Sequence, residues 1–163
     1  MSKLETVRHP IAPVYDKDSK ILILGSFPSV KSRETMFFYG HPQNRFWKVL
    51  SAIFEDKLPV SIEEKKAFLL RNHVAVWDVI GKCDIKGSSD ASIENVEAND
   101  LTLILDHCDI RQIYVNGRTA QKMYDRYIKD QIHRDCIALP STSPANAAWS
   151  LEKLIGVWKQ IKE

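Results

Sequence analysis

The sequence predicts an α/β fold, a three-layer α/β/α sandwich around a central parallel sheet of four strands. Three observations support this prediction: short apolar runs recur along the chain, helical patterns separate them, and no repeat or low-complexity tract interrupts the alternation. Alternating β and α elements favour parallel strands with helices on both faces. At 163 residues with 44% hydrophobic content, the chain is expected to form one domain over residues 1–163.

Four apolar runs predict the strands of this sheet. The first, Ile-Leu-Ile-Leu at 21–24, is apolar throughout, which is typical of a strand buried on both faces. The others are expected at 74–77, 113–115 and 136–139. The segment 1–20, which contains Pro10 and Pro13, is expected to wrap irregularly over the body.

Apolar residues at helical spacing predict helices between the strands. Ser61 followed by Glu64 forms a capping-box pattern, which marks the start of one of them. The polar stretch 81–92 is predicted to be a loop. The helices are expected at 43–54, 61–70, 99–107, 119–128 and 147–162.

Composition limits the functions that fit the chain. The net charge of +2 is too small for whole-molecule attraction to nucleic acid, so any DNA affinity must come from a local basic patch. Cys83, Cys108 and Cys136 form no C-x-x-C pair, which favours reduced thiols in a cytoplasmic protein. The histidines lack metal-ligand spacing, so neither a metal nor a cofactor is expected. No apolar run reaches membrane-spanning length, so no membrane partner is expected.

The loop after the first strand contains the strongest functional signal. Gly-Ser-Phe-Pro-Ser at 25–29 ends the strand, and the polar and aromatic loop that follows is where open α/β sheets bind ligands. The turn lacks the glycine patterns of phosphate-binding loops and of a nucleophile elbow. Phe38 and Tyr39 precede Gly-His-Pro in a loop, so a helix is not expected to bury them. Aromatic faces beside small polar groups suit a nucleobase.

Polar residues also follow the other three strands, and carboxyl ends of parallel strands meet at one edge of a sheet. The candidates for DNA contact are Ser88 and Ser89 after the second strand, Asn116, Gly117 and Arg118 after the third, and Ser143, Pro144, Ala145 and Asn146 after the fourth. Weaker candidates for a phosphate-binding rim are Lys31, Arg33, Arg45 and Lys82. Turn-forming and capping roles are the ordinary alternative for these residues. A helix opening at Arg118 favours a phosphate contact.

Two motifs resemble those of the uracil-DNA glycosylase superfamily. The first combines Gly-Ser-Phe-Pro-Ser at 25–29 and Phe-Tyr at 38–39 with His-Pro-x-Asn-x-Phe-Trp at 41–47. The second, Leu-Pro-Ser-Thr-Ser-Pro-Ala-Asn at 139–146, lies between the last strand and the C-terminal helix. The hypoxanthine (deoxyinosine) DNA glycosylase branch is the most similar, and the resemblance covers about residues 20–160.

The resemblance implies a monofunctional, metal-free, monomeric DNA glycosylase. Such an enzyme flips a deaminated base out of damaged DNA and cleaves its glycosidic bond with water. In the hypoxanthine branch the asparagine of His-Pro-x-Asn carries catalysis, so Asn44 would be the catalytic residue that positions water or the sugar. The residues implied to hold the base are Gly25, Ser26 and Phe27 of the first turn, Phe38 or Tyr39 as a stacking platform, and Ser141.

The chain departs from the superfamily pattern in three places. Phe27 stands where many relatives have a water-positioning Asp or Asn, Ser141 replaces a histidine, and Ala145 replaces a leucine wedge. These departures favour loosely paired substrates such as inosine opposite thymine. Alternatives are uracil excision and, from a different class, a base-flipping protein that recognises lesions without cutting. A serine hydrolase is disfavoured, because neither Ser26 nor Ser141 lies in a nucleophile elbow.

Overall fold

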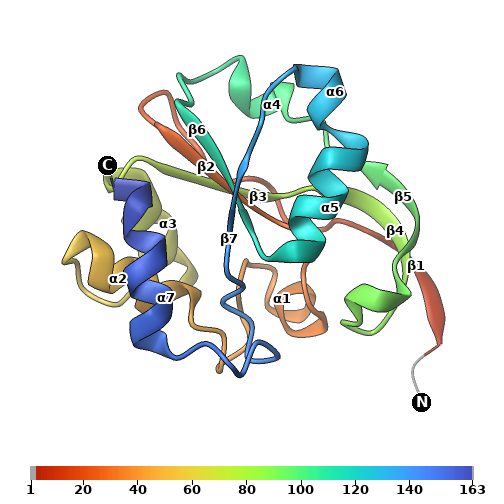
Figure 1. The fold of residues 1–163 in the computed structure, drawn as a ribbon, viewed down its shortest axis with the longest axis horizontal. Coiled ribbons are helices and arrows are strands. Elements are labelled where there is room, and N and C mark those ends of the chain that lie inside the picture. Colours follow the sequence, from red (N-terminus) through yellow and green to blue (C-terminus); the bar gives the residue numbers. More distant parts are fainter. Residues whose placement is uncertain (1–2, 163) are drawn as a thin grey trace.

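The computed structural model describes residues 3–162 and places a parallel sheet at the centre of the molecule (Figure 1). Its strands are β2 (Ile21–Gly25), β3 (Val74–Asp78), β6 (Gln112–Asn116) and β7 (Ile137–Leu139). They are arranged in the order β3-β2-β6-β7, and all neighbours are parallel. The predicted α/β class and four-stranded parallel sheet are confirmed, and each predicted strand ends within one residue of the observed one.

The apolar character of β2 and β3 explains their place in the sheet. Every residue of both strands is buried, so neither strand has a solvent face on which polar residues would alternate. An isolated bridge between Val14 and Val76 attaches the N-terminal segment to the outer side of β3.

Helices cover both faces of this sheet, which gives the predicted three layers (Figure 1). On one face lie α2 (Phe46–Phe54), α3 (Ile62–Arg71) and α7 (Leu151–Trp158), and on the other lie α4 (Thr102–Leu105), α5 (Arg118–Tyr127) and α6 (Lys129–Ile132). The predicted capping box at the start of α3 is present, because Ser61 and Glu64 bond to each other's backbone N–H groups. A 3-10 turn, η2 (Lys159–Lys162), continues α7.

Several helix bounds differ from the prediction. Helix α2 begins at Phe46 instead of 43, and α7 begins at Leu151 instead of 147 after an N-cap at Ser150. Helix α4 has only four residues. A short helix, α1 (Val30–Thr35), was not predicted, and Ser29 caps it by accepting a hydrogen bond from the Ser32 N–H.

A second, antiparallel sheet was not predicted either. It consists of β1 (Leu4–Arg8), β4 (Ile80–Lys86) and β5 (Glu94–Ala98), paired in the order β1-β4-β5. The expectation of an irregular segment at 1–20 is therefore wrong for β1, and that of a loop at 81–92 is wrong up to Lys86; residues 1–2 lie outside the described part. In β4 only Ile80, Cys83 and Ile85 are buried among polar neighbours, a pattern too weak to predict a strand.

The second sheet brings two segments to the carboxyl edge of the parallel sheet. After β1, the chain runs through His9 and Ile11, and the Trp77 indole N–H donates to the Ile11 carbonyl at 3.3 Å. After β4, the turn 87–92, with a 3-10 turn η1 (Asp90–Ser92), approaches the loop that follows β2. In Figure 1 this turn, α1 and the loop after β7 gather below the strand ends.

Candidate active site

A cavity of about 300 Å³ opens where the carboxyl ends of the parallel strands meet. The structure brings Asn44 together there with all six residues predicted to hold the base: Gly25, Ser26, Phe27, Phe38, Tyr39 and Ser141. Five predicted DNA-contact residues line the same cavity, namely Ser88, Asn116, Ser143, Pro144 and Ala145, whereas Ser89, Gly117, Arg118 and Asn146 do not. The fold therefore brings the carboxyl ends of the four parallel strands together at one site, as the sequence predicted.

Asn44 belongs to a hydrogen-bonded network that joins three loops. Its side-chain Oδ1 accepts from the Phe46 N–H at 3.0 Å and from the Thr142 hydroxyl at 2.8 Å. The Asn116 amide donates to the same Thr142 hydroxyl at 3.0 Å, and its Oδ1 accepts from the Thr142 N–H at 3.0 Å. The ends of β6 and β7 and the start of α2 are therefore held in fixed relation around Asn44.

These contacts also fix the orientation of the Asn44 amide. A backbone N–H only donates, so the atom that meets the Phe46 N–H must be the oxygen. The Nδ2 amino group has no hydrogen-bond partner among residues 3–162, and Asn44 lines the cavity half-buried. Asn44 therefore supports the start of α2 and keeps a polar group for a ligand.

Thr142 was not among the predicted site residues. It is fully buried, and its hydroxyl and both backbone polar groups are bonded, with the carbonyl accepting from the Arg45 N–H at 3.0 Å. Its position between Ser141 and Ser143 in the second motif was the available signal.

The aromatic loop is more buried than expected. Phe37 and Phe38 are each 2% exposed, and Tyr39 stacks on Phe46 with ring centroids 3.9 Å apart. The expectation that a helix does not bury Phe38 and Tyr39 is wrong for Tyr39, because it stacks on Phe46 of α2. Phe37 stacks on Trp47 of the same helix with ring centroids 6.0 Å apart, whereas Phe38 packs against Phe37 and His9. Phe38 and Tyr39 nevertheless line the cavity. Burial, reinforced by the charge of Asp78, raises the pKa of the Tyr39 hydroxyl, which therefore stays protonated.

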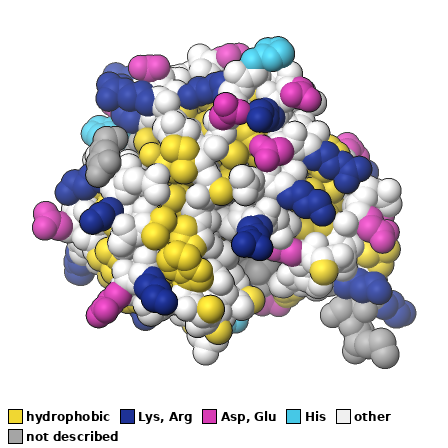
Figure 2. Space-filling model, viewed as in Figure 1, with side chains coloured by type: hydrophobic (Ala, Val, Ile, Leu, Met, Phe, Trp, Pro, Cys, Tyr) yellow, Lys and Arg dark blue, Asp and Glu magenta, His cyan; other side chains and the backbone are white. Residues whose placement is uncertain are grey.

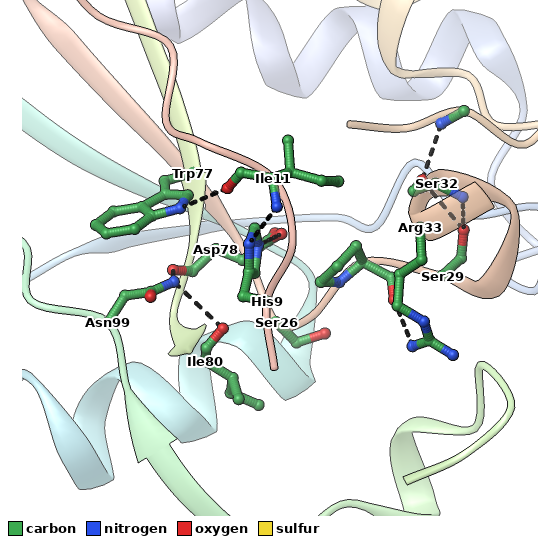
Figure 3. A network of polar contacts seen from close by, with 12 residues as sticks. His9, Ile11, Ser26, Ser29, Ser32, Arg33, Trp77, Asp78, Ile80 and Asn99 are labelled. Atoms are coloured by element: carbon green, nitrogen blue, oxygen red, sulfur yellow. Dashed lines mark hydrogen bonds and ion pairs between the residues drawn. The ribbon is translucent and has the colours of Figure 1, made fainter. Parts of the chain in front are cut away.

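A buried acid–imidazole pair lies at the floor of the cavity. Asp78, the last residue of β3, lines the cavity, and its Oδ2 lies 2.8 Å from Nε2 of His9 (Figure 3). Gly25 makes room for this carboxylate, since a Cβ there would lie 2.4 Å from Asp78 Oδ1. Neither Asp78 nor His9 was among the predicted site residues.

The turn after β4 forms one side of the cavity. The Ser26 hydroxyl donates to Asp90 Oδ1 at 3.3 Å, and the Ser88 hydroxyl accepts from the Val30 N–H at 2.8 Å. The residue Asp90 as a whole is exposed, but its carboxylate is largely removed from water, and this desolvation raises the pKa of the carboxyl group. Hydrogen bonds from Ser26 and Thr119 act in the opposite direction and lower that pKa. Arg33 connects this turn to the first motif by donating to the Gly87 and Pro28 carbonyls.

Arg45 was expected on a basic rim and is instead an internal connector. Its guanidinium donates to the carbonyls of Ser143 at 2.9 Å and Asn146 at 3.1 Å, and also to that of Trp149. The position of Arg45 gives no support to the predicted phosphate contact, because both terminal nitrogens of its guanidinium donate within the protein. The same reason applies to Arg33, whereas Lys31 stays exposed.

The residues predicted after β6 divide between two environments. Gly117 is buried with φ +97°, and a Cβ there would lie 3.1 Å from the Ser141 Cβ, so its position gives no support to a DNA contact. Arg118 is exposed at the start of α5. Asn146 donates from its side chain to the Ser141 carbonyl at 3.0 Å, which shapes the second motif from within.

Within residues 3–162, no group of three or more His, Cys, Asp or Glu side chains is arranged to hold a metal ion. The serines of the two motifs also lack a histidine partner there: Ser26 donates to Asp90, and the Ser141 hydroxyl accepts from the Ser143 N–H. No helix in this part of the chain has the length and apolar content to cross a membrane.

Comparison with known proteins agrees with this geometry. The family model of the uracil DNA glycosylase superfamily matches residues 12–162. The chain belongs to the uracil DNA glycosylase superfamily. The resemblance that the two motifs predicted is thereby confirmed, together with the enzyme class, a DNA glycosylase that hydrolyses N-glycosyl bonds.

Relatives of the chain are similar along nearly its whole length. The hypoxanthine DNA glycosylase of Methanosarcina acetivorans is 33% identical over 146 residues, which are 88% of this chain and 91% of that protein. The hypoxanthine DNA glycosylase of Methanosarcina barkeri is 32% identical over 136 residues, 82% of this chain and 85% of that protein. A solution structure from Methanosarcina acetivorans, described as a candidate uracil DNA glycosylase, is similar to this fold with a TM-score of 0.77 and 28% sequence identity. The match covers 98% of this chain and 100% of that chain.

Among superfamily members this chain has an apolar residue at a position where many use a polar one. Phe27 is 9% exposed and lies between the Arg33 guanidinium, 5.6 Å from its ring, and the His9 ring at 5.8 Å. Its side chain cannot position water. The carboxylate and amide side chains that line the cavity are instead those of Asn44, Asp78, Asp90 and Asn116.

Proposed function

We propose that this superfamily member releases hypoxanthine from deoxyinosine in DNA as a monofunctional, metal-free glycosylase. The observation that carries the proposal is the network through Thr142, which places the half-buried Asn44 amide in a cavity lined by both motifs. The name shared by the two Methanosarcina relatives supports the choice of hypoxanthine.

The proposed mechanism needs only positioned polar groups. As the glycosidic bond breaks, the sugar acquires oxocarbenium character and negative charge moves to the base. Groups fixed before the reaction stabilise such charges best, because they need no reorganisation. We assign Asn44 to the water or sugar, the rings of Phe38 or Tyr39 to the base face, and the backbone at Ser26 and Phe27 to the base oxygen.

Base choice follows from the polarity of that backbone. Hypoxanthine presents an oxygen where adenine presents an amino group, so a fixed N–H donor bonds to the first and stays unpaired against the second. An unpaired buried polar group costs about 1–3 kcal/mol, roughly ten- to a hundredfold in rate per contact. Adenine in normal DNA should therefore be left intact.

A panel of oligonucleotides with one lesion each tests the proposal. Under single-turnover conditions in EDTA, deoxyinosine should be cleaved, fastest opposite thymine, and adenine should not be. Faster excision of uracil than of hypoxanthine would move the chain to the uracil branch. Loss of cleavage in EDTA that added zinc or magnesium restores would contradict the metal-free mechanism. Tight binding with no released base would indicate a lesion-binding protein.

Arg118 should contribute to DNA affinity without reading sequence. Basic and acidic side chains are interspersed over the face in Figure 2, so phosphate binding must depend on local groups. Arg118 and Lys122 lie four residues apart on α5, and both are exposed. Arg118→Ala should weaken binding to all duplexes alike and flatten the salt dependence of affinity, because fewer counterions are displaced.

The control for this experiment is Arg111→Ala, an exposed arginine just before β6 at the opposite end of the sheet. This variant should bind DNA normally. An effect of Arg118→Ala confined to one lesion would show that Arg118 reads the base instead of the backbone. Gel filtration and localisation would check two further proposals, that the chain is a monomer and that it is cytoplasmic.

A further inference from the structure

We infer that Asp90 is a second catalytic residue of the proposed glycosylase, the carboxylate that faces the positive charge on the sugar and takes a proton from the attacking water. The inference deepens the proposed function and rests on it. Asn44 holds the water or the sugar, while Asp90 supplies the negative charge and the proton acceptor that a neutral amide lacks.

The Asn44 amide has no acceptor left for a proton or a cation. Both lone pairs of its Oδ1 are engaged, by the Phe46 N–H at 3.0 Å and by the Thr142 hydroxyl at 2.8 Å. What remains is the Nδ2 amino group, which only donates hydrogen bonds. Such a donor orients a water molecule through the water oxygen, but it neither accepts a proton from that water nor stabilises an oxocarbenium ion. Both tasks are therefore left to another group in the cavity.

Two carboxylates of the described residues line the cavity, and they lie at different depths. Asp78 lies at the floor with a side chain that is 5% exposed, and its Oδ2 is bonded to His9 at 2.8 Å. Asp90 lies at the side, in the turn after β4, and the residue as a whole is exposed. A flipped nucleotide enters base first, because its sugar stays attached to the DNA backbone outside the protein. The sugar is therefore nearer to Asp90 and the base nearer to the floor.

Hydroxyl groups, and not a cation, hold Asp90 at the cavity. The Ser26 hydroxyl donates to its Oδ1 at 3.3 Å, and Thr119 at the start of α5 is a second donor. No lysine, arginine or histidine of residues 3–162 forms an ion pair with it. Desolvation raises the pKa of the Asp90 carboxyl, and the charge of Asp78 adds to this rise. A carboxylate in such surroundings is a stronger base than usual, and a positive charge that forms beside it stabilises its ionised state.

The turn at 87–92 that carries this carboxylate is fixed to the loop after β2. The Ser88 hydroxyl accepts from the Val30 N–H at 2.8 Å, and the Arg33 guanidinium donates to the Gly87 carbonyl at 3.1 Å. A charged group stabilises a transition state best when it is in place before the reaction begins. These contacts provide that placement.

In the proposed step the C1′–N9 bond of deoxyinosine breaks, and its electron pair leaves with hypoxanthine. The water oxygen bonds to C1′ of the oxocarbenium sugar, and one water proton passes to the Asp90 carboxylate and from there to solvent. The hypoxanthine anion takes a proton from solvent. The products are hypoxanthine and an abasic sugar with a hydroxyl group on C1′, and water is the only co-reactant.

The first test is Asp90→Asn, which keeps an oxygen for the Ser26 hydroxyl but loses the charge. Single-turnover cleavage of a deoxyinosine duplex should fall on the order of a hundredfold in this variant and in Asp90→Ala, the lower end of what a general base contributes. The control is Asp84→Asn, which changes a carboxylate on β4 that bonds to Thr6 and Asn95, and it should cleave normally. Thermal melting of each variant separates misfolding from lost catalysis.

Two duplexes that cannot be cleaved test the charge by itself. One contains a pyrrolidine abasic analogue, whose protonated ring nitrogen is positively charged, and the other contains the neutral tetrahydrofuran analogue. The wild type should bind the pyrrolidine duplex about tenfold or more tightly than the neutral one, because hydrogen bonds between charged partners are the stronger ones. Asp90→Asn should bind the two duplexes within a few-fold of each other. A purely structural role for Asp90 would change both affinities alike.

A normal cleavage rate in Asp90→Asn would overturn the inference while leaving the glycosylase proposal standing. So would an unchanged preference of that variant for the pyrrolidine duplex, because Asp90 would then only shape the turn. Absence of any cleavage by the wild type would instead overturn the proposed function, and the inference with it.

Discussion

Replacing Asn44 with alanine is expected to slow single-turnover cleavage of a deoxyinosine duplex on the order of a hundredfold or more. The side chain lines the cavity, its Oδ1 is fixed by the Phe46 N–H and the Thr142 hydroxyl, and its Nδ2 has no partner in the described part of the chain. With Phe27 unable to position water, removal of this amide leaves no other amide or carboxylate of the first motif among the residues that line the cavity. Affinity for the duplex should change little.

The role of Asn44 in supporting the start of α2, one residue before the N-cap Arg45, must be separated from the catalytic one. Loss of its bond to the Phe46 N–H should lower the free energy of unfolding by about 1 kcal/mol. Asn44→Ser should recover most of that stability and stay nearly inactive. Ser61→Ala, which removes the cap of α3 far from the cavity, should lower stability similarly with normal cleavage.

Cleavage by Asn44→Ser at close to the wild-type rate would show that Asn44 is only a cap. The second motif, with Thr142 and its neighbours at 141–146, would then be the place to seek the catalytic group.

Replacing Arg45 with alanine should lower both DNA affinity and cleavage, roughly ten- to a hundredfold in rate. Its guanidinium holds the carbonyls of Ser143, Asn146 and Trp149 across about a hundred residues of sequence. The segment that these bonds fix lines the cavity and carries Thr142, so its loosening should disturb Asn44 as well. The melting temperature should also fall, because each of the lost hydrogen bonds contributes about 0.5–1.5 kcal/mol to the free energy of unfolding.

Arg45→Lys should not restore activity. A lysine ammonium is a compact charge without the planar fork that reaches several carbonyls at once. Arg111→Ala again serves as the control, since its side chain is exposed and remote from the cavity. Full activity in Arg45→Lys would indicate that positive charge, and not the fixed second motif, is what the enzyme needs at this position.

The parallel sheet could be predicted closely because its strands are apolar on both faces, as in Ile21–Gly25 and Val74–Asp78. The antiparallel sheet could not. In Leu4–Arg8 no residue is fully buried, and strands of this kind become stable only through pairing with distant partners. The predicted helix starts were wrong where a capping side chain, and not the spacing of apolar residues, sets the first residue of the helix. At α7, for example, the Ser150 side chain accepts a hydrogen bond from the Lys153 N–H.

The location of the site could be predicted from the sequence, but the contacts between side chains that are far apart in the sequence could not. Asn44 and the first turn are close in sequence and form a recognisable motif. His9 and Asp78 are 69 residues apart, and Arg45 and Trp149 are 104 residues apart. No local pattern in the chain pairs such residues, since only the fold brings them together.

The most direct test of the central claim is to identify the product released from a deoxyinosine duplex by the wild-type protein. With the enzyme in excess, mass spectrometry should find free hypoxanthine in an amount equal to the deoxyinosine duplex supplied. The DNA should hold an abasic site and break only after alkali, because water and not an enzyme amine attacks the sugar. Strand breakage without alkali, or an intact deoxyinosine strand at saturating enzyme, would contradict the account.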